Sequence, residues 1–430
     1  MMKDEVVIGA AQVGVKMVRF VCALVQLGVL ASLTACANFG RLEQDLENYS
    51  ADNIELQGVV RGTTKQPQPI VIVYFKDLEQ GGITKLRILS GDGNFRLLVD
   101  RNGGWLFAFV DANQDLKFQP DEEYGWYNGG EPLGATGSDQ SMKVNIRIGD
   151  GAGPPPPAAI VNRSLADVVN FRQISVGQVA ALDEERFSPE SAEQGMWQPY
   201  KSLMDGYAGL FMLDEYDPAK VPVVFVHGVS GTPRSFEQIF TSLDQSRYQA
   251  WFLNYPSGFS LPVLGAFFYQ AMELLEYRYS FANAHVVAHS MGGLVARQYL
   301  NNCSEQGRCD YLRSYTSIAS PYGGMPSASM GVEYAPTSIP VWSDLAPESD
   351  FLANLFVADL PQDLRFNLVF TFHTDDLIGG QSSDGVVALV SQLRPAAQAQ
   401  ADRLWGIDAT HVGVLTDEEF LQGFSGLLAE

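Results

Sequence analysis

The second half of the sequence alternates between short continuous apolar runs and longer amphipathic stretches. Val221–Val226 is a continuous apolar run, which is typical of a strand buried on both faces of a sheet. Leu261–Tyr279 instead has the length expected of a helix. Further strands are expected at residues 249–255, 285–288, 315–319 and 367–372, and a closing helix at residues 416–428. This alternation predicts a doubly wound, mostly parallel α/β sheet over residues 164–430.

Residues 54–148 show a different pattern, in which short β-branched and aromatic runs are separated by turn residues. Ile70–Phe75 and Trp105–Val110 are two such runs, and Ser90–Asn94 is a turn cluster of Gly, Asp, Asn and Ser. Short strands at this spacing predict a small all-β sandwich domain. Residues 149–163 are rich in Gly and then Pro, a composition typical of a linker, so we place the domain boundary there.

The N-terminal segment has the order of a secretory signal. Lys16 and Arg19 precede the apolar run Phe20–Leu33, which is too short to span a bilayer comfortably because a helix needs about 20 apolar residues. Small residues then precede a cysteine, as expected at a cleavage point. The stretch Leu-Thr-Ala-Cys, which ends at Cys36, resembles the processing box of bacterial lipoproteins.

That resemblance implies that residues 1–35 are removed as a signal peptide and that Cys36 carries the lipid that anchors the protein to a membrane. Residues 36–53 would then be a polar tether. Because Ala37 follows the cysteine in place of Asp, the resemblance implies the outer membrane of a bacterial cell envelope. An ordinary cleaved signal followed by a chance cysteine is the alternative.

Charge and cysteine content narrow the possible partners. The chain has 28 Lys and Arg against 50 Asp and Glu, a formal net charge of −22. Such a surface argues against nucleic acid, which is bound through clustered Lys and Arg, and against docking on an anionic membrane by charge alone. Apart from Cys22 and Cys36, the cysteines are Cys303 and Cys309, whose spacing in an exported protein predicts a local disulfide.

The stretch Val287–Gly293 places Ser290 between an expected strand and an expected helix. A serine nucleophile needs a sharp strand-to-helix turn with small flanking residues, so that Oγ projects at the end of the sheet. Ala288 and Gly292 are the small flanks here, with Ala in place of the first Gly of the G-x-S-x-G pattern. The sequence therefore predicts Ser290 as a nucleophile.

A serine nucleophile in such a sheet needs a histidine base and a carboxylate that follow it along the chain, in the order Ser, acid, His. His411 is the histidine that follows both the serine and the acid candidates. We take Asp384 as the acid, with Asp375 and Asp376 as competitors. His227 precedes the serine, so we expect it to shape its own loop by hydrogen bonding.

An oxyanion hole needs two backbone N–H donors, one after the nucleophile and one from the first loop that follows a strand. Met291 is the residue after Ser290. Val229 comes just after the His-Gly pair that ends the run Val221–Val226. We expect these two residues to supply the donors.

Together these motifs resemble the α/β-hydrolase superfamily, specifically bacterial lipases and related esterases, over about residues 220–430. The resemblance implies hydrolysis of carboxylic esters or acyl lipids through an acyl-enzyme, without a cofactor for catalysis. An acyltransferase with the same triad and a degenerate surface-binding lipoprotein are the alternatives. Residues 325–364 are either an apolar lid or an ordinary packed insertion.

One loop of the all-β region has the spacing of a calcium site. Oxygen ligands at positions 1, 3, 5, 7 and 12 would come from Asp111, Asn113, Asp115, the carbonyl of Lys117, and Glu122. The loop has Leu at position 6, where calcium loops normally have Gly, and its flanks have the pattern of strands. The sequence is therefore compatible with two alternatives, a loop that binds a structural calcium ion and an acidic loop that is only solvated.

Overall fold

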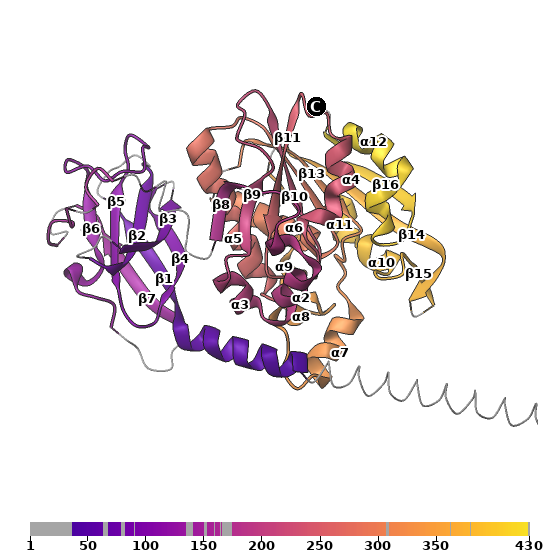
Figure 1. Cartoon of the computed structure of the whole chain (residues 1–430), viewed down its shortest axis with the longest axis horizontal. Helices are drawn as coiled ribbons and strands as arrows, with labels where there is room; N and C mark the ends of the chain where they lie inside the picture. Colours follow the sequence, from indigo (N-terminus) through magenta and orange to yellow (C-terminus); the bar gives the residue numbers. More distant parts are fainter. Residues whose placement is uncertain are drawn as a thin grey trace, which may run out of the picture.

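The computed structural model describes residues 37–428 apart from 63–67, 79–81, 90, 135–140, 150–152, 159, 164, 166–173, 307–308, 362 and 379. The expected signal peptide and Cys36 lie outside the described residues. The described chain forms an all-β domain, a larger α/β domain, and a helix over residues 37–52 that runs past both (Figure 1). None of the described helices combines the length and the apolar character needed to cross a membrane.

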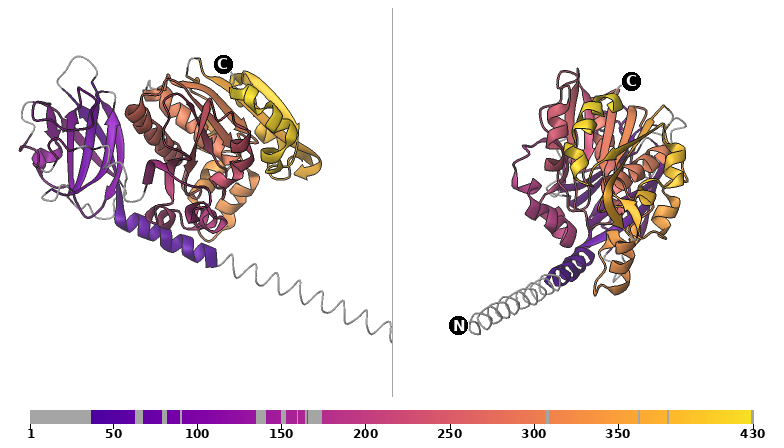
Figure 2. Two further views of the ribbon diagram at one scale, coloured as in Figure 1. Left: turned by 45° about the horizontal axis from the view of Figure 1, so that its top comes forward. Right: turned by 90° about the vertical axis from the view of Figure 1, so that its right-hand side faces the viewer.

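The all-β domain is a sandwich of two sheets, as the sequence predicts (Figure 2). Its strands are β1 (Asn53–Arg61), β2 (Ile70–Asp77), β3 (Gly82–Leu89), β4 (Gly93–Asp100), β5 (Trp105–Val110), β6 (Tyr124–Trp126) and β7 (Ser141–Arg147). One sheet has the order β4-β1-β7 and the other β3-β2-β5-β6. Residues of β1 alternate between buried and partly exposed, because one face of this sheet lies on the sandwich core.

The α/β domain is built on a sheet of order β15-β14-β13-β12-β10-β11-β9-β8, with β16 paired to β14. Its strands are β8 (Ile174–Val179), β9 (Ala208–Met212), β10 (Val221–Val226), β11 (Tyr248–Asn254), β12 (Ala284–His289), β13 (Leu312–Ile318), β14 (Arg365–Ile378), β15 (Gln381–Ser383) and β16 (Arg403–Asp408). The six neighbouring strands β11, β10, β12, β13, β14 and β16 run parallel to one another. Two strands run antiparallel to their neighbours: β9 pairs with β11, and β15 pairs with β14. The predicted mostly parallel sheet is confirmed.

Helices cover both faces of this sheet. They are α2 (Pro189–Trp197), α3 (Pro199–Met204), α4 (Glu237–Ser242), α5 (Leu261–Tyr279), α6 (Met291–Gln306), α7 (Pro326–Tyr334), α8 (Pro340–Leu345), α9 (Asp350–Asn354), α10 (Leu389–Gln392), α11 (Pro395–Gln400) and α12 (Glu418–Leu428). Val224 and Val226 of β10 belong to the core on the side of α5 and α6, while Val223 and Phe225 belong to the core under α4 and α12. The continuous apolar run of β10 thus reflects burial on both faces.

The stretch after Cys36 differs from the expected tether. Residues 37–52 form a helix, and Leu42 on it is fully buried. The Asp45 carboxylate accepts hydrogen bonds from the backbone N–H groups of Tyr200 (2.7 Å) and Lys201 (2.8 Å), at the start of α3. The ring of Phe39 packs edge-on against Trp197. The N-terminal helix is therefore fastened to the α/β domain.

The predicted disulfide between Cys303 and Cys309 is present, with Cα atoms 5.6 Å apart. It closes the chain between the end of α6 and the beginning of β13. Both cysteines are buried in the larger core.

Candidate active site

Ser290 lies in the sharp turn between β12 and α6, with a positive backbone φ of 56°. Such a conformation is strained for a residue other than Gly and is typical of a nucleophile held at the end of a sheet. The turn also requires small neighbours. A Cβ at Gly292 would lie 2.4 Å from the carbonyl oxygens of Val226 and His227, and one at Gly228 would lie 2.8 Å from Cβ of Ser290.

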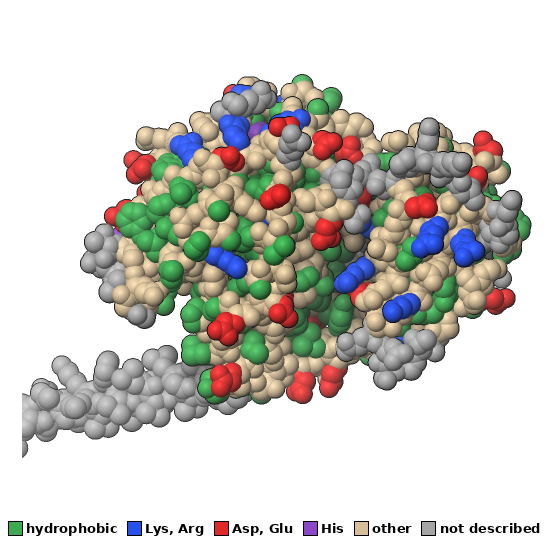
Figure 3. Space-filling model, turned by 180° about the vertical axis from the view of Figure 1, so that it is seen from behind, with side chains coloured by type: hydrophobic (Ala, Val, Ile, Leu, Met, Phe, Trp, Pro, Cys, Tyr) green, Lys and Arg blue, Asp and Glu red, His purple; other side chains and the backbone are tan. Residues whose placement is uncertain are grey.

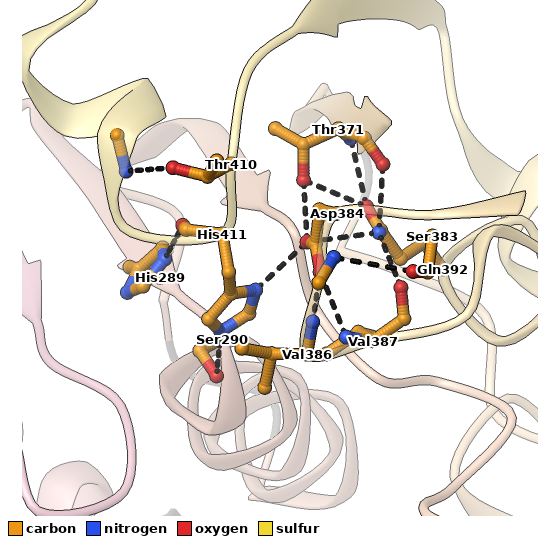
Figure 4. Close-up of polar contacts among 12 residues, drawn as sticks. His289, Ser290, Thr371, Ser383, Asp384, Val386, Val387, Gln392, Thr410 and His411 are labelled. Carbon is orange, nitrogen blue, oxygen red and sulfur yellow. Dashed lines mark hydrogen bonds and ion pairs between the residues drawn. The ribbon is translucent and has the colours of Figure 1, made fainter. Parts of the chain in front are cut away.

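The structure brings Ser290, His411 and Asp384 into one hydrogen-bonded line (Figure 4). His411 Nδ1 donates to Asp384 Oδ2 over 2.8 Å, because a carboxylate can only accept. Nε2 of the same ring is then the acceptor for the Ser290 hydroxyl, also at 2.8 Å. All three residues are buried, with side chains that come from three separate loops at one edge of the sheet.

Asp384 is the most heavily hydrogen-bonded residue of this line. Besides His411, its carboxylate accepts from Thr371 Oγ1 (2.6 Å), Gln392 Nε2 (3.1 Å), and the backbone N–H groups of Val386 (3.0 Å) and Val387 (2.7 Å). Burial alone would raise the pKa of the Asp384 carboxyl. The hydrogen bond and charge of His411, together with the other donors, hold this pKa below its usual value. The group is therefore ionised at neutral pH.

The competing acids occupy a different position. The strand predicted to end at Phe372 extends to Ile378, so Asp375 and Asp376 are part of β14 and not of a turn after it. The end of β14 pairs with β15. The side chains of residues 374–377 lie outside the described part of the structure.

Two supporting residues were not predicted from the sequence. His289 Nε2 donates to the His411 carbonyl over 2.8 Å, and burial lowers the pKa of His289 to about 3, so its ring is neutral. Gln392 donates to Asp384 and to the carbonyls of Thr371 and Val387, while its own oxygen accepts from the Thr371 N–H. The only sequence signal for His289 was its place beside the serine.

The loop after β10 lies against Ser290 and is shaped by His227. Nδ1 of this histidine donates to the Gly228 carbonyl (2.8 Å), its Nε2 accepts from the Tyr255 N–H (3.3 Å), and the two rings stack with centroids 4.2 Å apart. Burial lowers the pKa of His227 to about 4, so it stays neutral. Among the described residues, the N–H groups of Val229 and Met291 donate to no other protein group. Both N–H groups could therefore donate to the oxygen of a substrate carbonyl placed at Ser290.

Residues 325–364 form α7, α8 and α9, and the last two are firmly attached. Asp344 in α8 accepts from the Leu261 N–H at the beginning of α5 (2.7 Å). In α9, the backbone carbonyl of the buried Leu352 accepts from the Arg394 guanidinium (2.8 Å). In contrast, α7 has Ala328 as its buried residue and exposes most of its apolar side chains. A packed insertion therefore describes α8 and α9, whereas α7 lies on the surface.

The predicted calcium loop follows β5. Asp111 is fully buried, but its oxygens accept from the N–H groups of Asp115 (3.2 Å) and Leu116 (3.0 Å) and from the Tyr277 hydroxyl of α5. Asp115 and Glu122 likewise accept bonds from within the loop. Over the described residues, no group of three or more His, Cys, Asp and Glu side chains is arranged to hold a metal ion. A calcium ion at Asp111, Asn113, Asp115, Lys117 and Glu122 stays a prediction.

A known protein family matches part of the larger domain. Residues 265–412, which include Ser290, Asp384 and His411, match the family described as alpha/beta hydrolase of unknown function (DUF915). No curated protein matches the chain.

Three of the similar solved structures are a gene product of Listeria innocua, the mature lipase BlEst2 of Bacillus licheniformis and the phospholipase PlaB of Legionella pneumophila. Their identities to this chain are 18%, 18% and 19%, with TM-scores of 0.37, 0.38 and 0.34. The alignments cover 49%, 50% and 40% of this chain and 94%, 95% and 45% of those chains. The sheet order of the larger domain and the family match agree with the α/β-hydrolase fold that the sequence predicts.

Proposed function

We propose that this protein is a serine hydrolase of carboxylic esters, with Ser290 as nucleophile, His411 as general base and Asp384 as the acid that orients the histidine. The observation that carries the proposal is the line of two 2.8 Å hydrogen bonds from Ser290 through His411 to Asp384. In this arrangement the histidine takes the proton of the serine, and the ionised aspartate stabilises the resulting imidazolium.

The reaction follows from these roles. Ser290 Oγ attacks the ester carbonyl and transfers its proton to His411, and the N–H groups of Val229 and Met291 hold the oxyanion. His411 then protonates the departing alcohol, which leaves an acyl-Ser290. A water molecule, deprotonated by His411, attacks the acyl carbon, and the carboxylic acid departs as the proton returns to Ser290. Each proton moves between oxygen and His411 Nε2, so the steps need no further group.

An apolar rim favours acyl esters as substrates. Val229 in the oxyanion loop, Val386 two positions after Asp384 and Val412 next to His411 are all exposed. Exposed apolar side chains grouped at a site mark contact with an apolar partner. The lipid anchor at Cys36 is part of the proposal, because it would place the enzyme at a lipid surface.

Replacement of the nucleophile tests the proposal. Ser290→Ala should lower kcat for p-nitrophenyl esters on the order of 10⁶-fold while the melting temperature stays near that of the wild type. Ser246→Ala, an exposed serine, is the matched control and should keep full activity. A panel of ester chain lengths then defines the preferred acyl group. Near-normal turnover by Ser290→Ala would refute the assignment.

A further inference from the structure

Four of the five histidines of this chain are buried, and the proposed reaction uses one of them. Only small purple areas of histidine are visible on the face of the molecule in Figure 3. A buried imidazole needs hydrogen-bond partners inside the protein. His227 bonds within its own loop, and His285 bonds to the Ser314 hydroxyl (2.7 Å). The remaining buried histidine, His289, bonds to the general base itself.

His289 is the last residue of β12 and directly precedes the nucleophile Ser290. Its Nε2 lies 2.8 Å from the backbone carbonyl oxygen of His411, although the two residues are 122 positions apart. A carbonyl oxygen can only accept, so the proton of the His289 ring is on Nε2. The strand that leads to the nucleophile is thus tied to the loop that carries the base.

The backbone of His411 is held at a second point as well. Its N–H group donates to the backbone carbonyl of Asp384 over 2.9 Å. The two backbone polar groups of the base are therefore bonded to the acid and to the residue beside the nucleophile. The ring of His411 makes two further bonds, to Asp384 and Ser290, both at 2.8 Å. Four hydrogen bonds together fix the imidazole between its partners.

The loop around His411 has little packing on either side of the base. Thr410 and Val412 are exposed, whereas His411 between them is buried. Segments with few buried contacts open locally at a low cost in free energy. The position of His411 therefore depends on its hydrogen bonds more than on the packing of its neighbours.

The backbone bonds matter most in the acyl-enzyme. Once Ser290 carries the acyl group, it has no hydroxyl proton to donate, and the ring of His411 loses that partner. The backbone bonds of His411 to His289 and Asp384 do not depend on the protonation of the ring. They are therefore suited to hold the imidazole in place while it activates water.

The charge of His289 also suits this role. Burial, and then the nearby charge of His411, lower the pKa of His289 to about 3, so its ring is neutral at pH 7. The two imidazole rings have centroids 4.8 Å apart. A neutral donor at this distance does not oppose the imidazolium that forms on His411.

We propose that His289 is a positioning residue, whose Nε2–H bond to the His411 carbonyl keeps the base within reach of Ser290 and Asp384. This inference rests on the proposed function. A misplaced base slows proton transfer in acylation and in deacylation without removing any contact that binds the ester. Loss of the bond should therefore lower kcat and leave KM unchanged.

Two variants of nearly equal shape isolate the hydrogen bond. In His289→Gln the side-chain amide supplies an N–H donor in place of Nε2, whereas His289→Met has no donor. His289→Met should lower kcat for p-nitrophenyl acetate about 10²-fold, as expected when a catalytic group is slightly misplaced. His289→Gln should recover most of this loss. The matched control is His285→Met, which removes another buried histidine of β12 and should keep its kcat per folded molecule.

A spectroscopic measurement reports the position of the base without substrate. The Nδ1 proton between His411 and Asp384 should give a proton NMR signal at low field. His289→Gln should keep this signal, and His289→Met should shift or broaden it, while His285→Met should leave it unchanged. If His289→Met does not fold, His289→Ala, which adds no bulk and cannot reach the carbonyl, replaces it in both measurements.

The outcomes separate this inference from the proposed function. Turnover by Ser290→Ala would refute the proposed function itself. If Ser290→Ala is inactive but the donor-free variant of His289 keeps the wild-type kcat, only the positioning role is wrong. An equal loss in His289→Gln and His289→Met, or a rise in KM in place of the fall in kcat, would also overturn it.

Discussion

At the scale of single residues, the hydrogen bonds of Asp384 determine what its replacement would do. Oδ1 accepts from two backbone N–H groups, whereas Oδ2 accepts from His411, Thr371 and Gln392. An asparagine here would keep its oxygen on the backbone donors and turn its NH₂ group toward His411. That group can only donate, so His411 Nδ1 would have to accept and its proton would move to Nε2. In this tautomer the ring cannot accept the proton of Ser290.

We therefore predict that Asp384→Asn lowers kcat about 10⁴-fold with little loss of stability. Steady-state ester hydrolysis and thermal melting measure the two effects. Asp408→Asn is the matched control, because Asp408 also pairs with a histidine, His373, but at an exposed position (3.1 Å). Asp375→Asn and Asp376→Asn should cost far less. If Asp375→Asn or Asp376→Asn lost about 10⁴-fold in kcat while Asp384→Asn stayed active, the catalytic acid would be that aspartate of β14 and not Asp384.

A second residue-scale prediction concerns Glu122. Burial, together with the charges of Asp111 and Asp115, raises the pKa of the Glu122 carboxyl from 4.5 to about 7. Between these pH values the unfolded chain has lost the proton that the folded chain still holds, so stability falls as pH rises from about 4.5 to about 7. Glu122→Gln removes this effect. Its melting temperature should match the wild type at pH 4.5 and exceed it at pH 8.

The same pair of proteins tests the calcium loop. A bound cation would stabilise the ionised carboxylates, so millimolar calcium should raise the melting temperature of the wild type at pH 8 more than that of Glu122→Gln. An equal response to calcium and chelator in both proteins would favour the solvated acidic loop. Parallel pH profiles for the two proteins would show that the pKa of Glu122 is not raised.

Some residues of the candidate active site could be predicted from the sequence, and others could not. Ser290 and His411 follow from local motifs and chain order, because a strained turn needs particular neighbours. Asp384 required a choice among three carboxylates, and only the folded chain places it against His411. The contact of His289 with His411 spans 122 positions and that of Gln392 with Thr371 spans 21, so no local pattern could reveal these partners.

At the scale of elements, continuous apolar runs located the central strands, and two other strands of the large sheet, β9 and β16, were missed. The strand β16 lies at an edge of the sheet, is buried only at Ile407 and lacks such a run, whereas β9 is buried throughout but is short and contains Gly209. The helix over residues 37–52 did have a signal. Phe39, Leu42 and Leu46 follow one another at spacings of three and four residues, which is the period of a helix and not of a tether.

This helix and α7 lie close together (Figure 1). The ring of Phe39 packs against Trp342 of α8, with centroids 6.3 Å apart, and a Cβ at Gly331 of α7 would lie 2.5 Å from that indole. The chain therefore enters the described structure beside α7, where Met330 and Tyr334 are 58% and 74% exposed. Exposed apolar side chains next to an expected lipid anchor are well placed to meet a bilayer.

We predict that the double variant Met330→Ser/Tyr334→Ser keeps its kcat on a soluble short-chain ester but loses roughly tenfold in rate on esters presented in vesicles, as expected when about 1.5 kcal/mol of apolar contact is removed. Leu404→Ser is the matched control, because Leu404 is a similarly exposed apolar residue on β16. Equal losses on both substrates would mean that α7 contributes to folding or to the site itself.

At the scale of the whole molecule, the two domains share one hydrophobic cluster, which runs from β2, β3 and β5 of the sandwich to α5 and the large sheet. Sequence patterns could not predict this seam. The seam is held by contacts such as Arg87 with Glu273, which are far apart along the chain. Hydrophobic periodicity reports which face of an element is buried, but not which domain buries it. The packing of the two domains against each other is therefore a finding of the fold alone.

The net charge determines what can hold this molecule at a membrane. A formal charge of −22 is repelled by an anionic bilayer, and a small apolar patch on α7 gives only weak binding. A covalent lipid adds about 0.8 kcal/mol for each buried CH₂ group, which is enough to dominate both effects. If Cys36 carries such a lipid, its loss should release the protein even though the folded domains are unchanged.

We predict that Cys36→Ser, counted only over chains that have lost residues 1–35, moves from the membrane pellet to the soluble fraction after cell lysis without detergent. Cys22→Ser, a change within the expected signal peptide, is the matched control and should leave the mature protein in the pellet. Mass spectrometry of the N-terminal peptide of the wild type should show acyl groups on Cys36. A processed Cys36→Ser chain that still sediments with membranes, or an unmodified Cys36 in the wild type, would contradict the lipid anchor and leave α7 as the surface to examine.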